Sequence, residues 1–299
     1  MRNNTVKITS AFLGLAFISV TWIGCSSDNK KAKDLFGKDD SNATQDTSAI
    51  GIRVAKVKDI FTSVPGTVQI MQLLKAAGSK YSVDIPADPT VVSNYSTMKG
   101  QALNLGIYAA DLAYAGLFDQ KNDASLYLQS ANKLSTSLGI PDAFNDKVIS
   151  RIDANMTNQD SLLTIIVQDF WITDTYLKKN QRQEVSAYLV AGGWVEGLYM
   201  ATQIAAKSSS NMGVVNEIAY QKVTLQDLVD MIKTYPNSPG LQDFSAKLKA
   251  IQDVYANIQV DARPKDGAAP TDKTILSADQ LKAITDAVTS LRKEIIAGS

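Results

Sequence analysis

The sequence predicts an all-α protein, a single multi-helix domain of about nine to ten helices built from antiparallel helical hairpins. Three observations support this prediction. Apolar residues recur at helical spacing over most of the chain beyond residue 57, and capping residues, prolines and glycines divide that stretch into segments of helical length. Alternating runs of β-branched residues, which are typical of strands, are almost absent.

Helix boundaries follow from residues that start or stop helices. Pro65 and Gly78 bracket the first helix, and Asp88-Pro89 begins the second. The short turn at 119–122 predicts that the second and third helices form an antiparallel hairpin. A capping box at residues 277–280 begins the last helix. The predicted helices are 65–77, 88–118, 123–138, 143–154, 160–178, 182–206, 214–220, 225–235, 238–260 and 277–296, with a mobile loop near 261–276.

Three of the predicted helices carry apolar residues on more than one face, which is typical of buried helices. They are 88–118, 160–178 and 182–206, and we expect them to form the centre of the domain. Glycines at 192, 193 and 197 interrupt the last of these helices. Because glycine is unfavourable inside a helix, we expect close contact with the second helix, which offers Gly106. A kink that opens a pocket is the alternative.

Residues 1–24 have the pattern of an export signal. Arg2 and Lys7 are their only charged residues, and a largely apolar run follows from 8 to 23. This run is short for a membrane-spanning helix, and it ends abruptly in a polar stretch after Cys25. We therefore expect residues 1–24 to be removed.

The junction Trp22-Ile23-Gly24-Cys25 resembles the lipobox of bacterial lipoproteins, although Trp22 stands where an aliphatic residue is usual. The resemblance implies cleavage before Cys25 and lipidation of its thiol. Cys25 is also the only cysteine, so it has no partner for a disulfide. An ordinary secretory peptide that ends by chance at a cysteine is the alternative. Ser26 implies sorting to the outer membrane, and the lack of an acidic cluster after Cys25 favours its periplasmic face.

The predicted organisation is a signal peptide at 1–24, a lipidated Cys25 with a flexible polar tether at 25–56, and the helical domain at 57–299. The tether is rich in Ser, Asp, Asn, Lys and Thr and has few large apolar residues. Such a composition cannot bury enough surface to offset the entropy of ordering the chain.

Composition excludes several functions. The chain contains no histidine, which removes the common nucleophile–histidine pairs and histidine metal sites. After lipidation no thiol remains for catalysis or metal binding. Removing residues 1–24 takes away two basic residues and no acidic one, leaving 28 basic against 30 acidic residues. Without an excess of positive charge, we expect no nucleic-acid partner. We also expect no cofactor, no metal and no enzymatic activity.

Acidic residues inside the apolar helices are the candidates for a functional site. Asp111, Asp169 and Glu196 lie among apolar neighbours, whereas Asp174 precedes Lys178 by four residues and is interpreted as a surface pair. A carboxylate–metal centre of the four-helix type would need Glu-x-x-His pairs, which are absent.

Two interpretations of the three candidates remain. The first is a buried polar network that fixes the helix register. The second is a cleft for a small polar ligand, lined by Tyr108, Asp111, Tyr114, Asp169, Trp171, Trp194 and Glu196.

The stretches 101–116 and 191–199 are similar to uncharacterised all-helical lipoproteins of Bacteroidetes-type bacteria. That resemblance implies a helical fold and an envelope location but no activity. We therefore expect a lipoprotein held at the outer membrane by the lipid on Cys25, acting as a non-enzymatic scaffold or accessory subunit with envelope proteins as partners. A periplasmic binding protein for a small polar ligand is the alternative.

Overall fold

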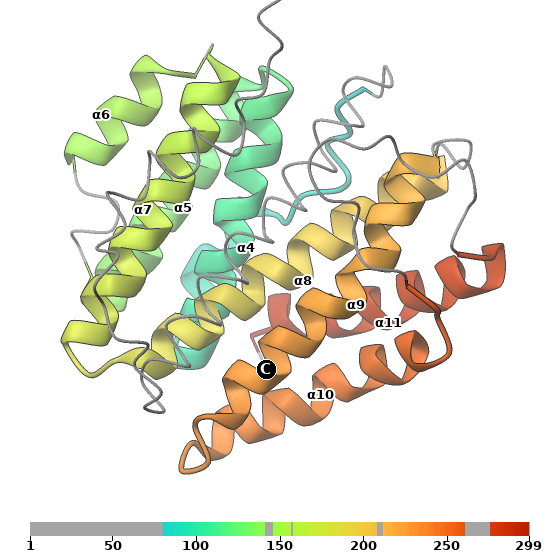
Figure 1. Ribbon diagram of the computed structural model, residues 1–299. Helices are drawn as coiled ribbons and strands as arrows, with labels where there is room; N and C mark the ends of the chain where they lie inside the picture. Colours follow the sequence, from blue (N-terminus) through green and yellow to red (C-terminus); the bar gives the residue numbers. More distant parts are fainter. Residues whose placement is uncertain (1–79, 141–145, 157, 208–211, 261–275, 299) are drawn as a thin grey trace, which may run out of the picture. The chain divides into compact units, whose positions relative to one another are not determined.

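The computed structural model describes residues 80–140, 146–156, 158–207, 212–260 and 276–298 (Figure 1). Within these ranges the structure contains one short 3-10 helix, α-helices and no β-strand, which confirms the predicted all-α class. The elements are η1 (Pro89–Asn94), α4 (Met98–Leu117), α5 (Lys121–Ser137), α6 (Asp146–Ala154), α7 (Gln159–Lys179), α8 (Gln183–Lys207), α9 (Met212–Lys233), α10 (Pro239–Ala256) and α11 (Ala278–Ile296). The helix predicted at 65–77, and the predicted loop at 261–276 except Leu276, lie outside the described residues.

Capping side chains begin several of these helices as predicted. Ser277 and Gln280 form a reciprocal capping box at the start of α11, and Asn158 accepts a hydrogen bond from the Ser161 amide at the start of α7. The prediction at Asp88 was wrong in part. Asp88 does cap a helix, but that helix is the 3-10 segment η1, and α4 begins ten residues later behind Thr97. Thr97 provides a second cap, because its side chain accepts a hydrogen bond from the Gly100 amide at the start of α4.

The predicted helices 214–220 and 225–235 form one continuous helix, α9. Thr224 is of a residue type that often caps a helix and directly precedes the second of these segments, but it is buried inside α9. The apolar positions explain this difference, because Val214, Ile218, Leu225 and Leu228 keep helical spacing through the interval. Tertiary packing of this continuous stripe outweighs the capping preference of one threonine.

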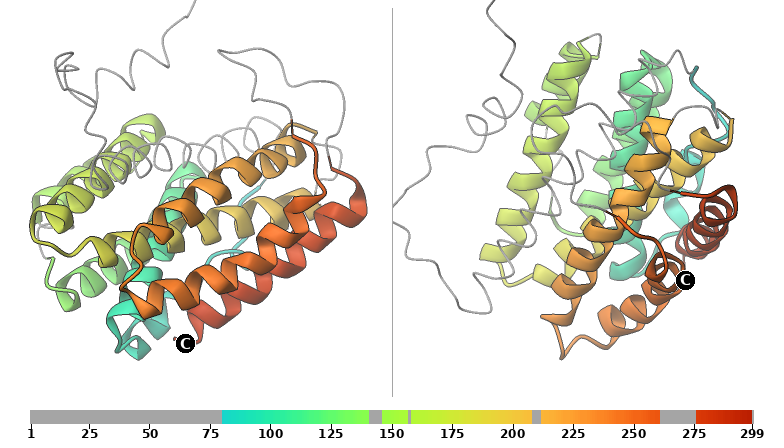
Figure 2. Two further views of the ribbon diagram at one scale, coloured as in Figure 1. Left: turned by 60° about the horizontal axis from the view of Figure 1, so that its bottom comes forward. Right: turned by 45° about the vertical axis from the view of Figure 1, so that its right-hand side comes forward.

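The helix α8 lies at the centre of the described fold and contacts α4, α7, α9, α10 and α11. Helices α4 to α7 pack on one side of it and α9 to α11 on the other (Figures 1 and 2). The predicted central position of 160–178 was wrong in part, because α7 buries one face against α4 and α8 and leaves Ile172 51% exposed. None of the described helices combines the length and apolarity needed to cross a membrane.

Glycines allow the backbones of α4 and α8 to touch. A Cβ atom on Gly192 would lie 2.0 Å from the carbonyl oxygen of Leu103, and one on Gly106 would lie 2.1 Å from that of Leu189. No side chain fits at such distances. The prediction of close helix contact is confirmed for Gly192 and Gly106, whereas a Cβ atom on Gly193 would have an ordinary contact of 3.5 Å, and α8 continues through its glycines as a single helix.

Candidate functional site

A segment that we call the strap, residues 80–95, docks on the helices ahead of α4. Pro86 and Pro89 lack an amide hydrogen and favour extended backbone in the residues that precede them, so few main-chain groups in this part of the strap pair with one another. The Ile85 amide does, because it donates to the Ser82 carbonyl oxygen (3.2 Å). For other groups, side chains of the helices provide the partners. The Ser82 amide donates to the Tyr114 hydroxyl (3.1 Å), and the Ala87 amide donates to Asp111 Oδ2 (3.2 Å).

Carbonyl oxygens of the strap are bound in the same way by donors from three helices. They accept hydrogen bonds from Arg292 Nη2 of α11 at Ile85 (3.1 Å), Tyr108 of α4 at Asp88 (3.0 Å) and Ser130 of α5 at Pro89 (3.3 Å). Gln101 Nε2 of α4 also donates to the Tyr95 carbonyl oxygen (3.1 Å), so the helices hold six main-chain groups of the strap.

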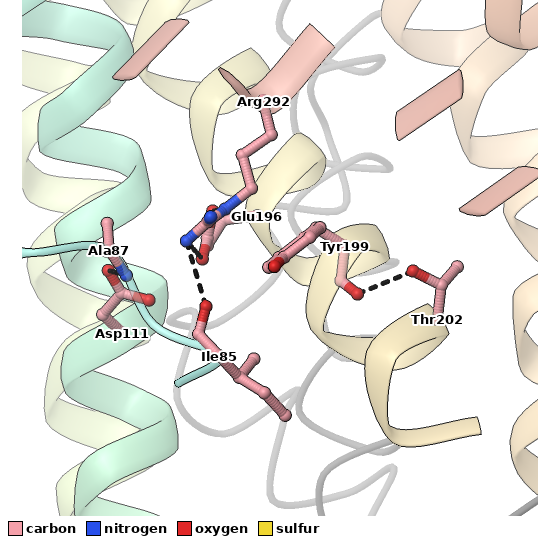
Figure 3. Close-up of polar contacts among 7 residues, drawn as sticks. All are labelled: Ile85, Ala87, Asp111, Glu196, Tyr199, Thr202 and Arg292. Atoms are coloured by element: carbon pink, nitrogen blue, oxygen red, sulfur yellow. Dashed lines mark hydrogen bonds and ion pairs between the residues drawn. The ribbon is translucent and has the colours of Figure 1, made fainter. Parts of the chain in front are cut away.

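An ion pair between α8 and α11 lies beneath the strap (Figure 3). Arg292 donates from Nε to Glu196 Oε2 (2.6 Å) and from Nη2 to Glu196 Oε1 (2.8 Å), which is a bidentate geometry. Glu196 is fully buried and Arg292 is 8% exposed. The guanidinium also lies 3.9 Å from the ring centre of Tyr199, so the ring face contributes to its stabilisation.

Asp111 of α4 completes this cluster. Its Oδ2 accepts a hydrogen bond from the Ala87 amide, whereas Oδ1 has no hydrogen-bond partner among the described groups. Burial raises the pKa of Asp111 well above its usual range, and the charge of Glu196 raises it further against the opposing effect of Arg292. A proton on Asp111 would remove the repulsion between its charge and that of Glu196. We call Asp111, Glu196 and Arg292 the clamp.

The structure brings four of the predicted site residues together around the strap: Tyr108, Asp111, Tyr114 and Glu196. Trp194 is buried in the core, and its indole nitrogen has no hydrogen-bond partner among the described groups. The side chain of Trp171 lies outside the described part of the structure.

Asp169 on α7 lies apart from the clamp, because its carboxylate makes no hydrogen bond to any of the three clamp residues. Its side chain is 2% exposed, and neither carboxylate oxygen has a hydrogen-bond partner among the described residues. Thr173, one turn further along α7, is also buried with an unpartnered hydroxyl. Burial raises the pKa of Asp169 to about 8, although the charge of Arg151 acts in the opposite direction.

This raised pKa predicts a pH-dependent stability. The unfolded chain ionises Asp169 near pH 4, so the contribution of its neutral form is complete below about pH 4 and is lost as the pH rises to about 8. We expect the stability of the wild type to fall relative to Asp169→Asn over this range by up to about 1.4 kcal/mol per pH unit. Urea unfolding of both proteins at pH 5 and pH 8 measures the difference. Parallel pH profiles would refute a buried neutral Asp169.

The interpretation of Asp174 as a surface pair was wrong in one respect. It pairs with Lys178 as predicted, but its side chain is buried and also accepts a hydrogen bond from Ser186 of α8. The pair therefore lies in the contact between α7 and α8. In the described chain, no three acidic residues gather closely enough to hold a metal ion.

Sequence reasoning missed Arg292, the clamp residue that pairs with Glu196 and donates to the Ile85 carbonyl oxygen of the strap. A signal was present, because Arg292 follows Val288 by four residues and Ile284 by eight, which places it on the apolar face of α11. A lone basic residue on a buried face requires a buried acidic partner. That argument leads to the acidic residues of the central helices, although it does not choose among them.

Comparison of the chain with protein-family models, with curated proteins and with solved structures finds no match. The role of the site therefore has to be inferred from its geometry and chemistry. The resemblance to helical Bacteroidetes-type lipoproteins stays a prediction.

Proposed function

We propose that this chain is a lipoprotein held by a lipid on Cys25 at the periplasmic face of the outer membrane. Its helical domain acts there as a non-enzymatic scaffold or accessory subunit for envelope proteins. The lipobox-like junction and the polar stretch after it support the anchor.

The scaffold role is supported by what the clamp residues contact. Two of the three carboxylates that could have lined a ligand cleft are engaged within the protein: Glu196 pairs with Arg292, and Asp111 binds the main chain of the strap, as Arg292 also does. Their donors and acceptors serve to hold one part of the chain to another. Such a network favours one arrangement of the helices, which suits a rigid partner-binding domain better than a catalytic one.

The anchor is tested by Cys25→Ala. We expect this variant to lose all incorporation of a labelled fatty acid and to move from the membrane fraction to the soluble fraction, because the thiol is the acylated atom. Trp22→Leu, which brings the junction closer to the usual lipobox, serves as the control and should remain labelled. Persistent labelling of Cys25→Ala would contradict the anchor.

The scaffold role is tested by reciprocal capture from crosslinked envelopes. A tagged lipoprotein should recover a defined envelope protein in near-equal amount, and that protein, when tagged, should recover the lipoprotein. Recovery of no reproducible partner in either direction would remove the basis for this role.

Binding of a small polar ligand is the second candidate, and Asp169 is the observation that favours it. A buried carboxyl and a neighbouring buried hydroxyl that both lack hydrogen-bond partners among the described residues are unusual in a folded protein. Native mass spectrometry of the protein isolated from its own periplasm gives the test. A small molecule retained by the wild type and lost in Asp169→Asn would favour this candidate over the scaffold.

A further inference from the structure

Asp169 and Thr173 place three buried oxygen atoms without partners on one face of α7. The two residues lie one turn apart, and their exposed fractions are 2% and 3%. Both carboxyl oxygens of Asp169 and the hydroxyl oxygen of Thr173 lack a hydrogen-bond partner among the described residues. Buried polar atoms are almost always hydrogen-bonded, so three such oxygens in adjacent turns of one helix require an explanation.

The Thr173 hydroxyl leaves unused a partner that its own helix offers. A threonine inside a helix can donate its hydroxyl to a carbonyl oxygen of the preceding turn. Thr202 does so to Tyr199 and Thr285 to Leu281, each at 2.7 Å. Thr173 is buried like Thr202 but makes no such bond. Its hydroxyl therefore stays available to a group outside the helix.

The Asp169 carboxyl is not neutralised by a cation of the described chain. Arg151 of α6 is the described charge that acts on it, but the Arg151 side chain is exposed and donates to Gln168 Oε1 (3.0 Å). An exposed charge is largely screened by solvent and salt. Helices α4 and α8 also pack against α7, and no described charge of theirs acts on this carboxyl. A proton neutralises it instead, and a cation from outside the chain could take the place of that proton.

We propose that Asp169 and Thr173 bind the ammonium group of a small primary amine. A primary ammonium group has three N–H donors and no acceptor, which matches three oxygens that need donors. Its single charge also matches a single carboxylate. A divalent metal ion would need further acidic ligands, and in the described chain no three acidic residues gather closely enough. This proposal rests on the second candidate function, small-ligand binding, and names its ligand class.

Amine binding is coupled to the release of a proton. Burial raises the pKa of Asp169 to about 8, so this carboxyl is mostly protonated at pH 6 and pH 7 in the free protein. An alkylammonium ion resembles that of lysine and keeps its own proton in this range, because its pKa is about 10. The amine therefore displaces about one proton from Asp169. We expect its affinity to rise roughly tenfold per pH unit between pH 6 and pH 7 and to level off above pH 8.

The test uses methylammonium chloride and the purified full-length protein. The midpoint of thermal unfolding, measured against methylammonium concentration at pH 6, 7 and 8, gives an apparent Kd at each pH. We expect a rise of about 3 °C at ten times the Kd. Potassium chloride and tetramethylammonium chloride at equal concentrations are the controls, because their cations carry the same charge without an N–H donor. They should show only a general salt effect without this pH dependence.

Three variants locate the site. Asp169→Asn keeps the shape of the side chain and should abolish the response specific to methylammonium. Thr173→Val should raise the Kd roughly tenfold, because it removes one hydrogen bond to a charged group. Thr202→Val is the matched control and should keep the Kd of the wild type, since the Thr202 hydroxyl bonds within α8.

Two results would overturn the amine site. One is an equal effect of methylammonium and potassium at every pH, and the other is an unchanged methylammonium response in Asp169→Asn or in Thr173→Val. The small-ligand function itself is judged separately by the native mass spectrometry described above. A neutral molecule retained through Asp169 would refute the amine as the ligand class and leave that function in place.

Discussion

Replacing Gly192 by alanine is expected to destabilise the domain by about 3 kcal/mol, the upper end of the cost of overpacking. The new methyl group would lie 2.0 Å from the carbonyl oxygen of Leu103 and 2.8 Å from its carbonyl carbon. Backbone atoms of a central helix cannot move aside as a flexible side chain can. Chemical denaturation followed by circular dichroism measures the change in the free energy of unfolding.

Gly193→Ala is the matched control because it lies one residue along the same helix. A Cβ atom there would meet the Gly106 carbonyl oxygen at 3.5 Å, which is an ordinary contact. Alanine is favoured over glycine inside a helix, so we expect this variant to equal the wild type or exceed it by up to about 1 kcal/mol. Equal destabilisation by both substitutions would contradict the claim that Gly192 is needed for the backbone contact between α4 and α8.

Replacing Arg292 by alanine is expected to cost about 3–5 kcal/mol, the range found when one partner of a buried ion pair is removed. Glu196 would remain fully buried without its cation, and the carbonyl oxygen of Ile85 would lose its donor. Helix α11 would also lose its hydrogen bonds to α8 and to the strap at this position. The change is measured by urea unfolding at neutral pH.

Two comparisons distinguish the loss of a buried ion pair from the loss of a charge as such. Lys282→Ala removes a solvent-exposed ion pair of α11 and should change stability by less than about 1 kcal/mol. The double variant Glu196→Gln with Arg292→Met removes both charges of the pair, so it should lose less stability than the two single changes added together. If Arg292→Ala behaved like Lys282→Ala, the clamp would have no structural role.

Much of the fold could be predicted because its signals are local. Helical spacing and the capping box at residue 277 act over a few residues, and the structure confirms them. The errors arose where two local signals competed. Asp88 and Thr97 are both good caps, and only tertiary packing decides that α4 begins at the second.

The candidate site could be predicted only in part because its contacts are distant in sequence. Arg292 meets Ile85 across 207 residues and Glu196 across 96. Asp111 and Asp169 look alike in the sequence, since each is an acidic residue in an apolar helix. Their surroundings differ, because Asp111 lies near an arginine–glutamate pair and binds a main-chain amide, whereas Asp169 has no hydrogen-bond partner in the part of the chain that the structure describes. Helical periodicity does not tell which helix faces each carboxyl.

The central claim is that the clamp holds the strap to the helices. Hydrogen exchange at the Ala87 amide, which donates to Asp111, tests it most directly. We expect this amide to be protected in the wild type and to exchange much faster in Arg292→Met, while amides inside α10 keep their protection. Fast exchange of the Ala87 amide in the wild type, or equal protection in both proteins, would contradict the claim.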